Sequence, residues 1–418
     1  MSRSATEESA GAAVLYLSYD GMTDPLGRSQ VLPYLLGLSK RGHRISLISF
    51  EKPERTAEER KTVADLCTDS GIDWHPLPYH HTPPVLSTIA DVRRMYRLAL
   101  RLHRERRFGL VHCRSYIPAL AGLWLKRRTG IRFIFDMRGF WADERLEGGG
   151  WNMANPLFAG VYRYFKRRER EFWAEADQIV SLTHEGTQVL EAARRQGNKV
   201  APVTIIPCCV EFDVFPPANA ERQDRARALL GIGPDEHVLG YIGSLGGNYM
   251  VDEMLDFFAA YRERYRPAKF LFVTQVPAEQ IRAAAHSRGI PLHAILVRAA
   301  GRAVVAKLMA AADTGIAFKQ ASFSAKACSP TKLGEMLAME LPVIVNDGVG
   351  DVAQVVDETG AGVVIDRFDR QSYERALDSL ESLRPKMDRW RVASRKWFDL
   401  EQGVDRYDAI YQSCLSRA

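Results

Sequence analysis

The sequence predicts an α/β protein built from two doubly wound, Rossmann-like domains that face a central cleft. The chain has 418 residues, 46% of them hydrophobic, which is too long for one hydrophobic core. Apolar strands alternate with amphipathic helices along the whole chain, and this pattern is typical of parallel sheets covered on both faces. The pattern restarts after a polar, proline-containing stretch at 211–225, which we interpret as a linker. We therefore expect an N-terminal domain at 1–210, a C-terminal domain at 211–395, and a last helix at 396–418 that crosses back to the first domain.

The first half begins with a continuous apolar strand and a helix that ends at a glycine. Strands are predicted at 12–19, 44–51, 109–115, 132–139, 178–183 and 203–210, and helices at 29–42, 90–107 and 155–176. No GxGxxG motif opens the first strand–helix unit, where "YDGMTDPLGRS" stands instead. This absence disfavours a nicotinamide-dependent dehydrogenase.

The second half repeats the same alternation with shorter elements. Strands are predicted at 237–245, 269–275, 293–299, 314–320, 342–347 and 360–366. Helices are predicted at 251–265, 278–289, 303–313 and 330–340, followed by final helices over about 370–415. In two such domains, ligands bind at the carboxyl ends of the strands, which is why we expect the cleft to be the functional site.

Composition and charge limit the class of protein. The longest apolar run, 117–125, is far below the roughly 18 residues that span a bilayer, and the polar N-terminus does not predict a signal peptide. The six cysteines show no metal-ligand spacing, so we expect a cytoplasmic protein without a metal site, and we expect Cys208 and Cys209 to be buried. Residues 1–210 carry 31 Lys and Arg against 23 Asp and Glu, whereas the remainder carries 26 against 28. The basic first half indicates an anionic partner.

The stretch "SPTKLGEMLAMELPVIV", residues 329–345, carries polar side chains at the start of an otherwise apolar helix. We expect Ser329 to be the N-cap and Pro330 the first helical residue, so that free amides at the helix start suit a phosphate. Lys332 would add a cation, and Glu335, one turn after Thr331, could accept hydrogen bonds from both hydroxyls of a ribose. The alternative is a capped core helix with a surface lysine and glutamate.

This stretch resembles the nucleotide-sugar motif of retaining GT-B glycosyltransferases of the GT4-like, group 1 family. "DMRGFWADE", "IIPCCVEFDVF" and "GYIGSLGGNY" look like members that act in bacterial surface-polysaccharide assembly, and the resemblance covers essentially the whole chain. It implies a GT-B fold and transfer, with retention, of a sugar from a nucleoside-diphosphate sugar to a hydroxyl of a sugar or lipid-linked acceptor. It also implies that no metal is needed and that the nucleotide sugar is a substrate, with no other cofactor.

The sequence departs from the family's pattern in three places. Ala327 stands where the first glutamate of the family's Glu-x7-Glu motif is expected, and Glu340 replaces the usual glycine before x-Pro. A left-handed Glu340 would strain the helix end by about 1 kcal/mol. "SLGGNY" replaces the expected phosphate-binding Arg and Lys. From this stretch we expect donor contacts by Ser244, Gly246, Gly247, Asn248 and Tyr249.

Other candidate site residues follow strands of either half. In the loop after the first strand, Gly27 and Arg28 are candidate donor-phosphate contacts. Asp136 and Arg138, close to Asp143 and Glu144, are candidate catalytic residues, with a salt-bridged loop as the alternative. Arg298 is a candidate for the nucleotide pocket, with a surface arginine as the alternative.

The helices at 90–107 and 155–176 combine apolar faces with dense Arg and Lys. A solvated charged face is one interpretation, and peripheral docking to an anionic membrane at its inner face is the other. We find no base-stacking platform, so nucleic acid is not an expected partner. Two other functions stay open, namely a catalytically silent nucleotide-binding scaffold, and a nucleotide-sugar epimerase or phosphorylase on the same fold.

Overall fold

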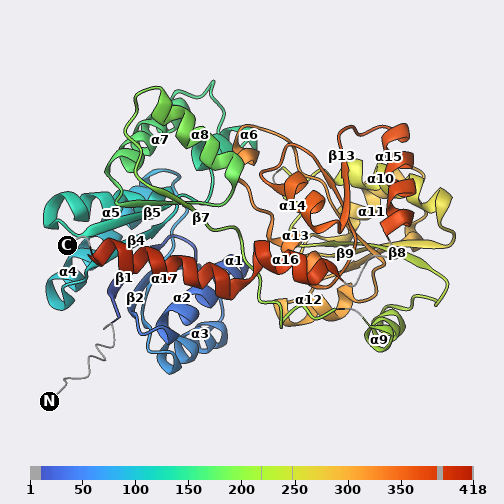
Figure 1. Ribbon diagram of the computed structural model, residues 1–418, viewed down its shortest axis with the longest axis horizontal. Helices are drawn as coiled ribbons and strands as arrows, with labels where there is room; N and C mark the ends of the chain where they lie inside the picture. The colour runs from blue at the N-terminus through green and yellow to red at the C-terminus, as the bar shows by residue number, and fades with distance from the viewer. Residues whose placement is uncertain (1–10, 218, 247, 384–388, 417–418) are drawn as a thin grey trace, which may run out of the picture. The chain divides into compact units, whose positions relative to one another are not determined.

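Two parallel sheets form the framework of the protein in the computed structural model, which describes residues 11–217, 219–246, 248–383 and 389–416 (Figure 1). The chain divides into two compact units. The first holds the described residues of Met1–Leu146, Trp151–Ile206 and Leu400–Ala418, and the second holds Glu147–Gly150 and Pro207–Asp399. The changes between units fall at 206 and 399, where the sequence suggested 210 and 395.

The first unit contains a seven-stranded sheet in the order β3-β2-β1-β4-β5-β6-β7. Its strands are β1 (Ala13–Ser18), β2 (Arg44–Glu51), β3 (Asp73–Pro78), β4 (Leu110–Arg114), β5 (Arg132–Asp136), β6 (Gln178–Ser181) and β7 (Val203–Ile205). The helices before β7 are α1 (Pro25–Gln30), α2 (Leu32–Lys40), α3 (Ala57–Asp69), α4 (Leu86–Arg106), α5 (Tyr116–Thr129), α6 (Trp141–Glu147), α7 (Pro156–Glu175) and α8 (His184–Arg195). Strand β3 was not predicted, because its sequence is polar and contains prolines. Such a sequence is tolerated at the edge of a sheet, which is the position that β3 occupies.

Helices cover both faces of this sheet, as the doubly wound prediction requires. On β4, His112 contacts Tyr411 of α17 (Leu400–Ser416), while the next residue, Cys113, faces Gly122 of α5. Since successive side chains of a strand point to opposite faces, α17 and α5 lie on opposite sides of the sheet. Figure 1 shows α17 beside α2, and a Cβ on Gly37 of α2 would lie 2.6 Å from Val404, so this glycine lets the two helices approach.

The second unit contains a six-stranded sheet in the order β10-β9-β8-β11-β12-β13. Its strands are β8 (His237–Ile242), β9 (Ala268–Val273), β10 (Ile295–Arg298), β11 (Thr314–Ala317), β12 (Val343–Asn346) and β13 (Gly362–Ile365). Its α-helices are α9 (Ala220–Leu230), α10 (Val251–Arg264), α11 (Ala278–His286), α12 (Arg302–Met309), α13 (Thr331–Ala338), α14 (Val352–Thr359), α15 (Arg370–Leu383) and α16 (Trp390–Phe398), and its 3-10 turns are η1 (Leu292–Ala294) and η2 (Ser324–Ala327).

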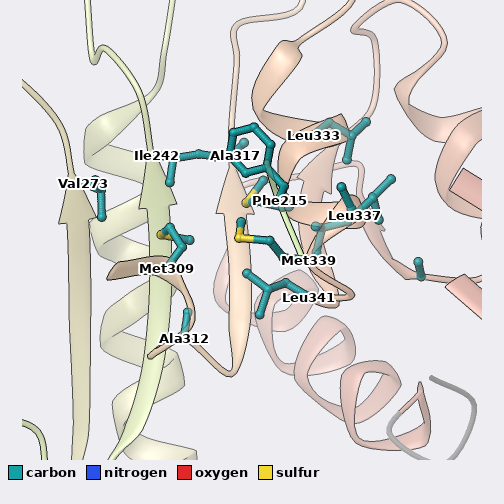
Figure 2. Packing of buried hydrophobic residues seen from close by; sticks show 14 of the residues in the cluster. Phe215, Ile242, Val273, Met309, Ala312, Ala317, Leu333, Leu337, Met339 and Leu341 are labelled. Carbon is teal, nitrogen blue, oxygen red and sulfur yellow. The ribbon is translucent and has the colours of Figure 1, made fainter. Parts of the chain in front are cut away.

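Alternating side chains of β8 enter two separate cores. Val238 and Ile242 belong to the core that holds the apolar face of α13, including Leu333 and Leu337 (Figure 2). Leu239 and Tyr241 belong to the core under α10 and α15 on the other face. Helix α13 is therefore anchored on the sheet by its leucines, and this fixes where its polar first turn lies.

The stretch 211–225 is not a linker, so that prediction is wrong. Phe212 and Phe215 are buried in the core of the second unit, and the Arg391 guanidinium donates hydrogen bonds to the carbonyl oxygens of both. The end of the stretch is helical, because the Asn219 side chain accepts a hydrogen bond from the Arg222 amide and caps α9. Prolines and charge suggested a loop, but two aromatic anchors hold the segment on the domain.

Candidate functional site

The polar residues of the second unit gather at the carboxyl ends of β8 and β11. These two strands are neighbours at the centre of the sheet, and the strand order reverses between them. Gly243 and Ser244 follow β8, and Phe318 and Lys319 follow β11. Such a switch point is where open α/β sheets bind their ligands.

Helix α13 begins one residue later than the sequence suggested. Pro330 is its N-cap and Thr331 its first residue, so the prediction of Ser329 as the N-cap is wrong. The Ser329 hydroxyl instead accepts a hydrogen bond, 3.1 Å long, from the backbone amide of Cys208. Because no side chain caps the helix, its first amides are left for a ligand or for water. Cys208 and Cys209 are buried, as predicted.

Lys332 is a buried cation in the first turn of α13, with only 6% of its surface exposed. Its ammonium donates a hydrogen bond of 2.7 Å to the Tyr241 hydroxyl and lies 3.2 Å from the centre of the Tyr249 ring. Burial lowers the pKa of Lys332 well below its usual value; Glu335 opposes this effect, and the positive charge of Lys319 adds to it. An anion bound here would remove much of that cost.

Gly243 leaves room for this lysine. Its φ of +96° is a conformation that other residues rarely adopt, and a Cβ there would lie 3.2 Å from Lys332 Cε. The glycine is therefore required both by the turn after β8 and by the lysine that passes it.

Glu335 lies one turn along α13, as predicted, and is partly exposed. Among the residues that the structure describes, no donor forms a hydrogen bond or ion pair with its carboxylate. Loss of solvent raises the pKa of Glu335 to about 7, against the attraction of Arg302 and Lys332. A partly exposed carboxylate that accepts no hydrogen bond from the described residues is suited to hydroxyl donors of a ligand.

The segment after β8 crosses the end of β11. Asn248 is buried, and its carbonyl oxygen accepts a 2.7 Å hydrogen bond from the Gln320 amide, while Tyr249 pairs with Lys319 in an antiparallel bridge. The Ser244 carbonyl oxygen accepts hydrogen bonds from Tyr241 and Lys332, so Ser244 and Tyr249 both contact the lysine. A Cβ on Gly246 would meet no atom within 4 Å, and Gly247 lies outside the described residues.

Arg298 is not part of this group. It is exposed at the end of β10, the edge strand, and its guanidinium donates to the neighbouring carbonyl of Val297. The arginine that acts on Glu335 is Arg302, at the start of α12, which also forms a 2.6 Å ion pair with Glu211.

In the first unit, the loop after β1 is held by the buried carboxylate of Glu51. The backbone amides of Met22 and Thr23 donate to it at 2.7 and 3.0 Å. A Cβ on Gly27 would lie 2.1 Å from the carbonyl oxygen of Gly21, so the loop's own packing requires this glycine. Arg28 is partly buried, and its Nε has no hydrogen-bond partner among the described residues, which leaves it able to bind an anion.

Asp136 ends β5 and is fully buried. The Tyr407 hydroxyl donates to it at 3.0 Å, His112 Nε2 lies 3.4 Å away, and Arg138 lies 3.9 Å away. Burial alone would raise the pKa of Asp136, but the positive charge of Arg138 and the His112 hydrogen bond outweigh it, and the pKa is lowered. Arg138 has φ +56°, a left-handed conformation for a non-glycine residue. Asp136 is thus a buried, ionised anchor for its neighbours.

Asp143 and Glu144 do not join Asp136 in one acidic group. Asp143 is buried and accepts hydrogen bonds, both 2.8 Å long, from Tyr162 and Lys166 of α7. Glu144 is exposed. For Asp143, the salt-bridge alternative is the one that the structure bears out.

Two family descriptions match most of the sequence: "Glycosyl transferase 4-like domain" at residues 28–209 and "Glycosyl transferases group 1" at residues 222–397. The chain belongs to the GT4-like, group 1 glycosyltransferases. It transfers a sugar from a nucleotide-sugar donor. A comparison of this glycosyltransferase with curated proteins finds no match.

Solved structures show that the glycosyltransferase has the GT-B fold, as predicted. A glycosyltransferase from Rickettsia africae matches with a TM-score of 0.72 and 14% identity, over 98% of this chain and all of the other. WaaG, a glycosyltransferase involved in lipopolysaccharide biosynthesis, matches with 0.64 and 18%, over 95% and 99%. HepE from Anabaena, in complex with UDP and glucose, matches with 0.66 and 12%, over 96% and 100%.

Four residues of the glycosyltransferase's candidate donor site were not predicted from the sequence, namely Tyr241, Gly243, Arg302 and Lys319. Only Lys319 had a usable signal, because it is a lysine at the carboxyl end of the apolar strand predicted at 314–320. In the described part of the glycosyltransferase, no cluster of His, Cys, Asp or Glu is suited to hold a metal ion, and no helix is long and apolar enough to cross a membrane.

Proposed function

We propose that the first turns of α13 and the segment after β8 hold the nucleoside diphosphate of the donor. The observation that carries this proposal is Lys332, a buried cation one turn from the Glu335 carboxylate. Among the described residues, neither group forms an ion pair, and no donor forms a hydrogen bond with the carboxylate. Lys332, the Thr331 amide and the Ser329 hydroxyl proton would bind the diphosphate. Glu335 would accept hydrogen bonds from the ribose.

This arrangement supports transfer without a metal ion. The leaving diphosphate gains negative charge as the sugar departs, and a lysine with helix amides can stabilise that charge where it develops. Transfer with retention is part of the same proposal and rests on the family alone.

The acceptor, we propose, is a sugar or lipid-linked carbohydrate of a surface polysaccharide, reached at an anionic membrane surface. Helix α7 supports this with one outward face that carries exposed Leu157 and Tyr164 among exposed Arg163, Arg167 and Arg170. Exposed apolar and basic side chains together are typical of a helix that lies in a lipid headgroup layer.

We expect vesicles that contain anionic lipid to bind the protein at low salt and release it as salt rises, because screening beyond about 8 Å weakens such attraction. The variant Arg163→Glu, Arg167→Glu, Arg170→Glu should sediment with vesicles far less than the wild type. Lys166 is unsuitable for this test, since it forms ion pairs with Asp143 and Glu169 inside the domain. Equal sedimentation of both proteins would refute the docking face.

The experiment that tests the donor site is a thermal-stability screen against UDP, GDP, CMP, ADP and dTDP, followed by turnover of the matching nucleotide sugars with and without chelator. A ligand at about 100 times its Kd stabilises a protein by about 2.7 kcal/mol. Slow donor hydrolysis with nucleotide release supports a transferase. Binding without turnover favours the silent scaffold, and a changed sugar still attached to its nucleotide favours an epimerase. No stabilisation by any nucleotide would overturn the proposal.

A further inference from the structure

Lys319 is held in a fixed position at the end of β11. Its amide donates a 2.8 Å hydrogen bond to the side chain of Asn346, and its carbonyl oxygen accepts one of 2.9 Å from the same side chain. Asn346 ends the neighbouring strand β12 and is buried. A buried amide that bonds both backbone groups of one residue fixes where the side chain of that residue begins.

The side chain of Lys319 is buried beside that of Lys332. Only 8% of Lys319 is exposed, and its ammonium lies 5.1 Å from the centre of the Tyr249 ring, the same ring that Lys332 approaches to 3.2 Å. Tyr249 is held there by its backbone bridge to Lys319. Two buried ammonium groups therefore share one aromatic ring.

Within the described residues, Glu335 attracts Lys332 but forms no ion pair with either lysine. Among the residues that the structure describes, neither lysine forms an ion pair, and the lysines repel one another, since Lys319 lowers the pKa of Lys332. Buried charges in proteins are normally paired, because an unpaired one loses its hydration without compensation. A pair of buried cations at the switch point of a sheet is suited to an anion of at least two charges.

We propose that Lys319 is a second cationic ligand of the donor diphosphate, beside Lys332. This inference rests on the proposed function and adds to it a residue from the segment that follows β11. The segment after β8, "SLGGNY", carries no cation of its own. Lys319, which follows β11, supplies the positive charge that this segment lacks. Tyr249 holds both ammonium groups beside the diphosphate and out of solvent. An uncharged side chain of the same length would pack against Tyr249 as well as the aliphatic part of Lys319 does. Removing only the charge therefore separates a role in ligand binding from a role in packing.

The test is calorimetric titration of Lys319→Met, which keeps the length of the side chain and removes its charge. The probes are the stabilising nucleoside diphosphate, its nucleoside, and inorganic pyrophosphate. Lys307→Met is the matched control, because Lys307 is an exposed lysine of α12 in the same unit. We expect Lys319→Met to weaken the nucleoside diphosphate and pyrophosphate by about 10- to 150-fold, the range for a hydrogen bond to a charged group, and the nucleoside by less than about twofold. Lys307→Met should leave all three unchanged.

Each other outcome is decisive. If Lys319→Met binds the diphosphate as Lys307→Met does, the Lys319 assignment is overturned while the proposed function stands. An equal loss for nucleoside and diphosphate would show that Lys319 only supports the fold. Lys319→Gln is measured in parallel, and failure of both variants to fold would overturn the assignment in the same way. A wild-type protein that binds neither nucleotide nor pyrophosphate would overturn the proposed function and this inference together.

Discussion

The pKa of Glu335 makes the ribose assignment testable through pH. A carboxylate accepts hydrogen bonds from both hydroxyls of a ribose only when it is ionised, and the pKa of Glu335 in the free protein is raised to about 7. At pH 6 about a tenth of the carboxyl groups are ionised, against about nine tenths at pH 8. We therefore expect nucleoside affinity to increase by about tenfold between pH 6 and pH 8.

The assay is calorimetric titration with the nucleoside, because the terminal phosphate of a diphosphate itself titrates near pH 6 and would obscure the effect. Glu335→Gln keeps the shape of the side chain and cannot ionise, so its affinity should be weaker at pH 8 and independent of pH. The 2′,3′-dideoxy nucleoside should bind both proteins with little dependence on pH. The reasoning is refuted if the wild type shows no pH dependence, or if Glu335→Gln shows the same one.

Stability should change in the opposite direction. Folding raises the pKa of Glu335 above its unfolded value of 4.5, so the folded protein binds more protons between about pH 4.5 and 7. The free energy of unfolding therefore decreases as pH rises through that window, and Glu335→Gln should remove this contribution. Glu335 is partly exposed, so the change is smaller than complete burial would give.

Three further substitutions test separate features. Lys332→Met should leave the free protein as stable as the wild type, or more stable, in denaturant unfolding, because a buried unpaired charge is removed. It should weaken the binding of nucleoside diphosphate far more than that of nucleoside. A loss of more than about 2 kcal/mol of stability would contradict this. Glu340 has φ +61°, so Glu340→Gly should stabilise the protein by about 0.5–1 kcal/mol, whereas the helical control Asp357→Gly should destabilise it by a similar amount. If Asp136 acts in transfer, Asp136→Asn should lower turnover at least about tenfold with unchanged nucleotide affinity; unaltered turnover would remove Asp136 from the catalytic residues.

Most of the fold and one element of the candidate site could be predicted from the sequence. Apolar strands and amphipathic helices are local patterns, which is why two doubly wound domains could be predicted from them. Lys332 and Glu335 lie on one helix, so their spacing alone placed them one turn apart. The family resemblance marked Glu340 as a position where glycine is usual, and the structure shows it to be left-handed.

What the sequence could not supply depends on neighbours that are distant in the chain. Lys319 meets Tyr249 only because β11 lies beside β8, and Gly243 matters only because Lys332 of α13 passes it. Ser329 has the right side chain for an N-cap, but the Cys208 amide, 121 positions earlier, takes its hydroxyl instead. Asp136 likewise ends an apolar strand, as expected of a site residue, and its burial under Tyr407 could not be read from β5.

The return of α17 to the first unit has a consequence for synthesis of the chain. Tyr407 and Tyr411 of this helix donate to or contact Asp136 and His112, which come from β5 and β4. A ribosome delivers those two tyrosines only after the whole second unit has been made. The sheet of the first unit, although translated first, therefore stays partly uncovered until α17 emerges, so the second unit is complete before the first.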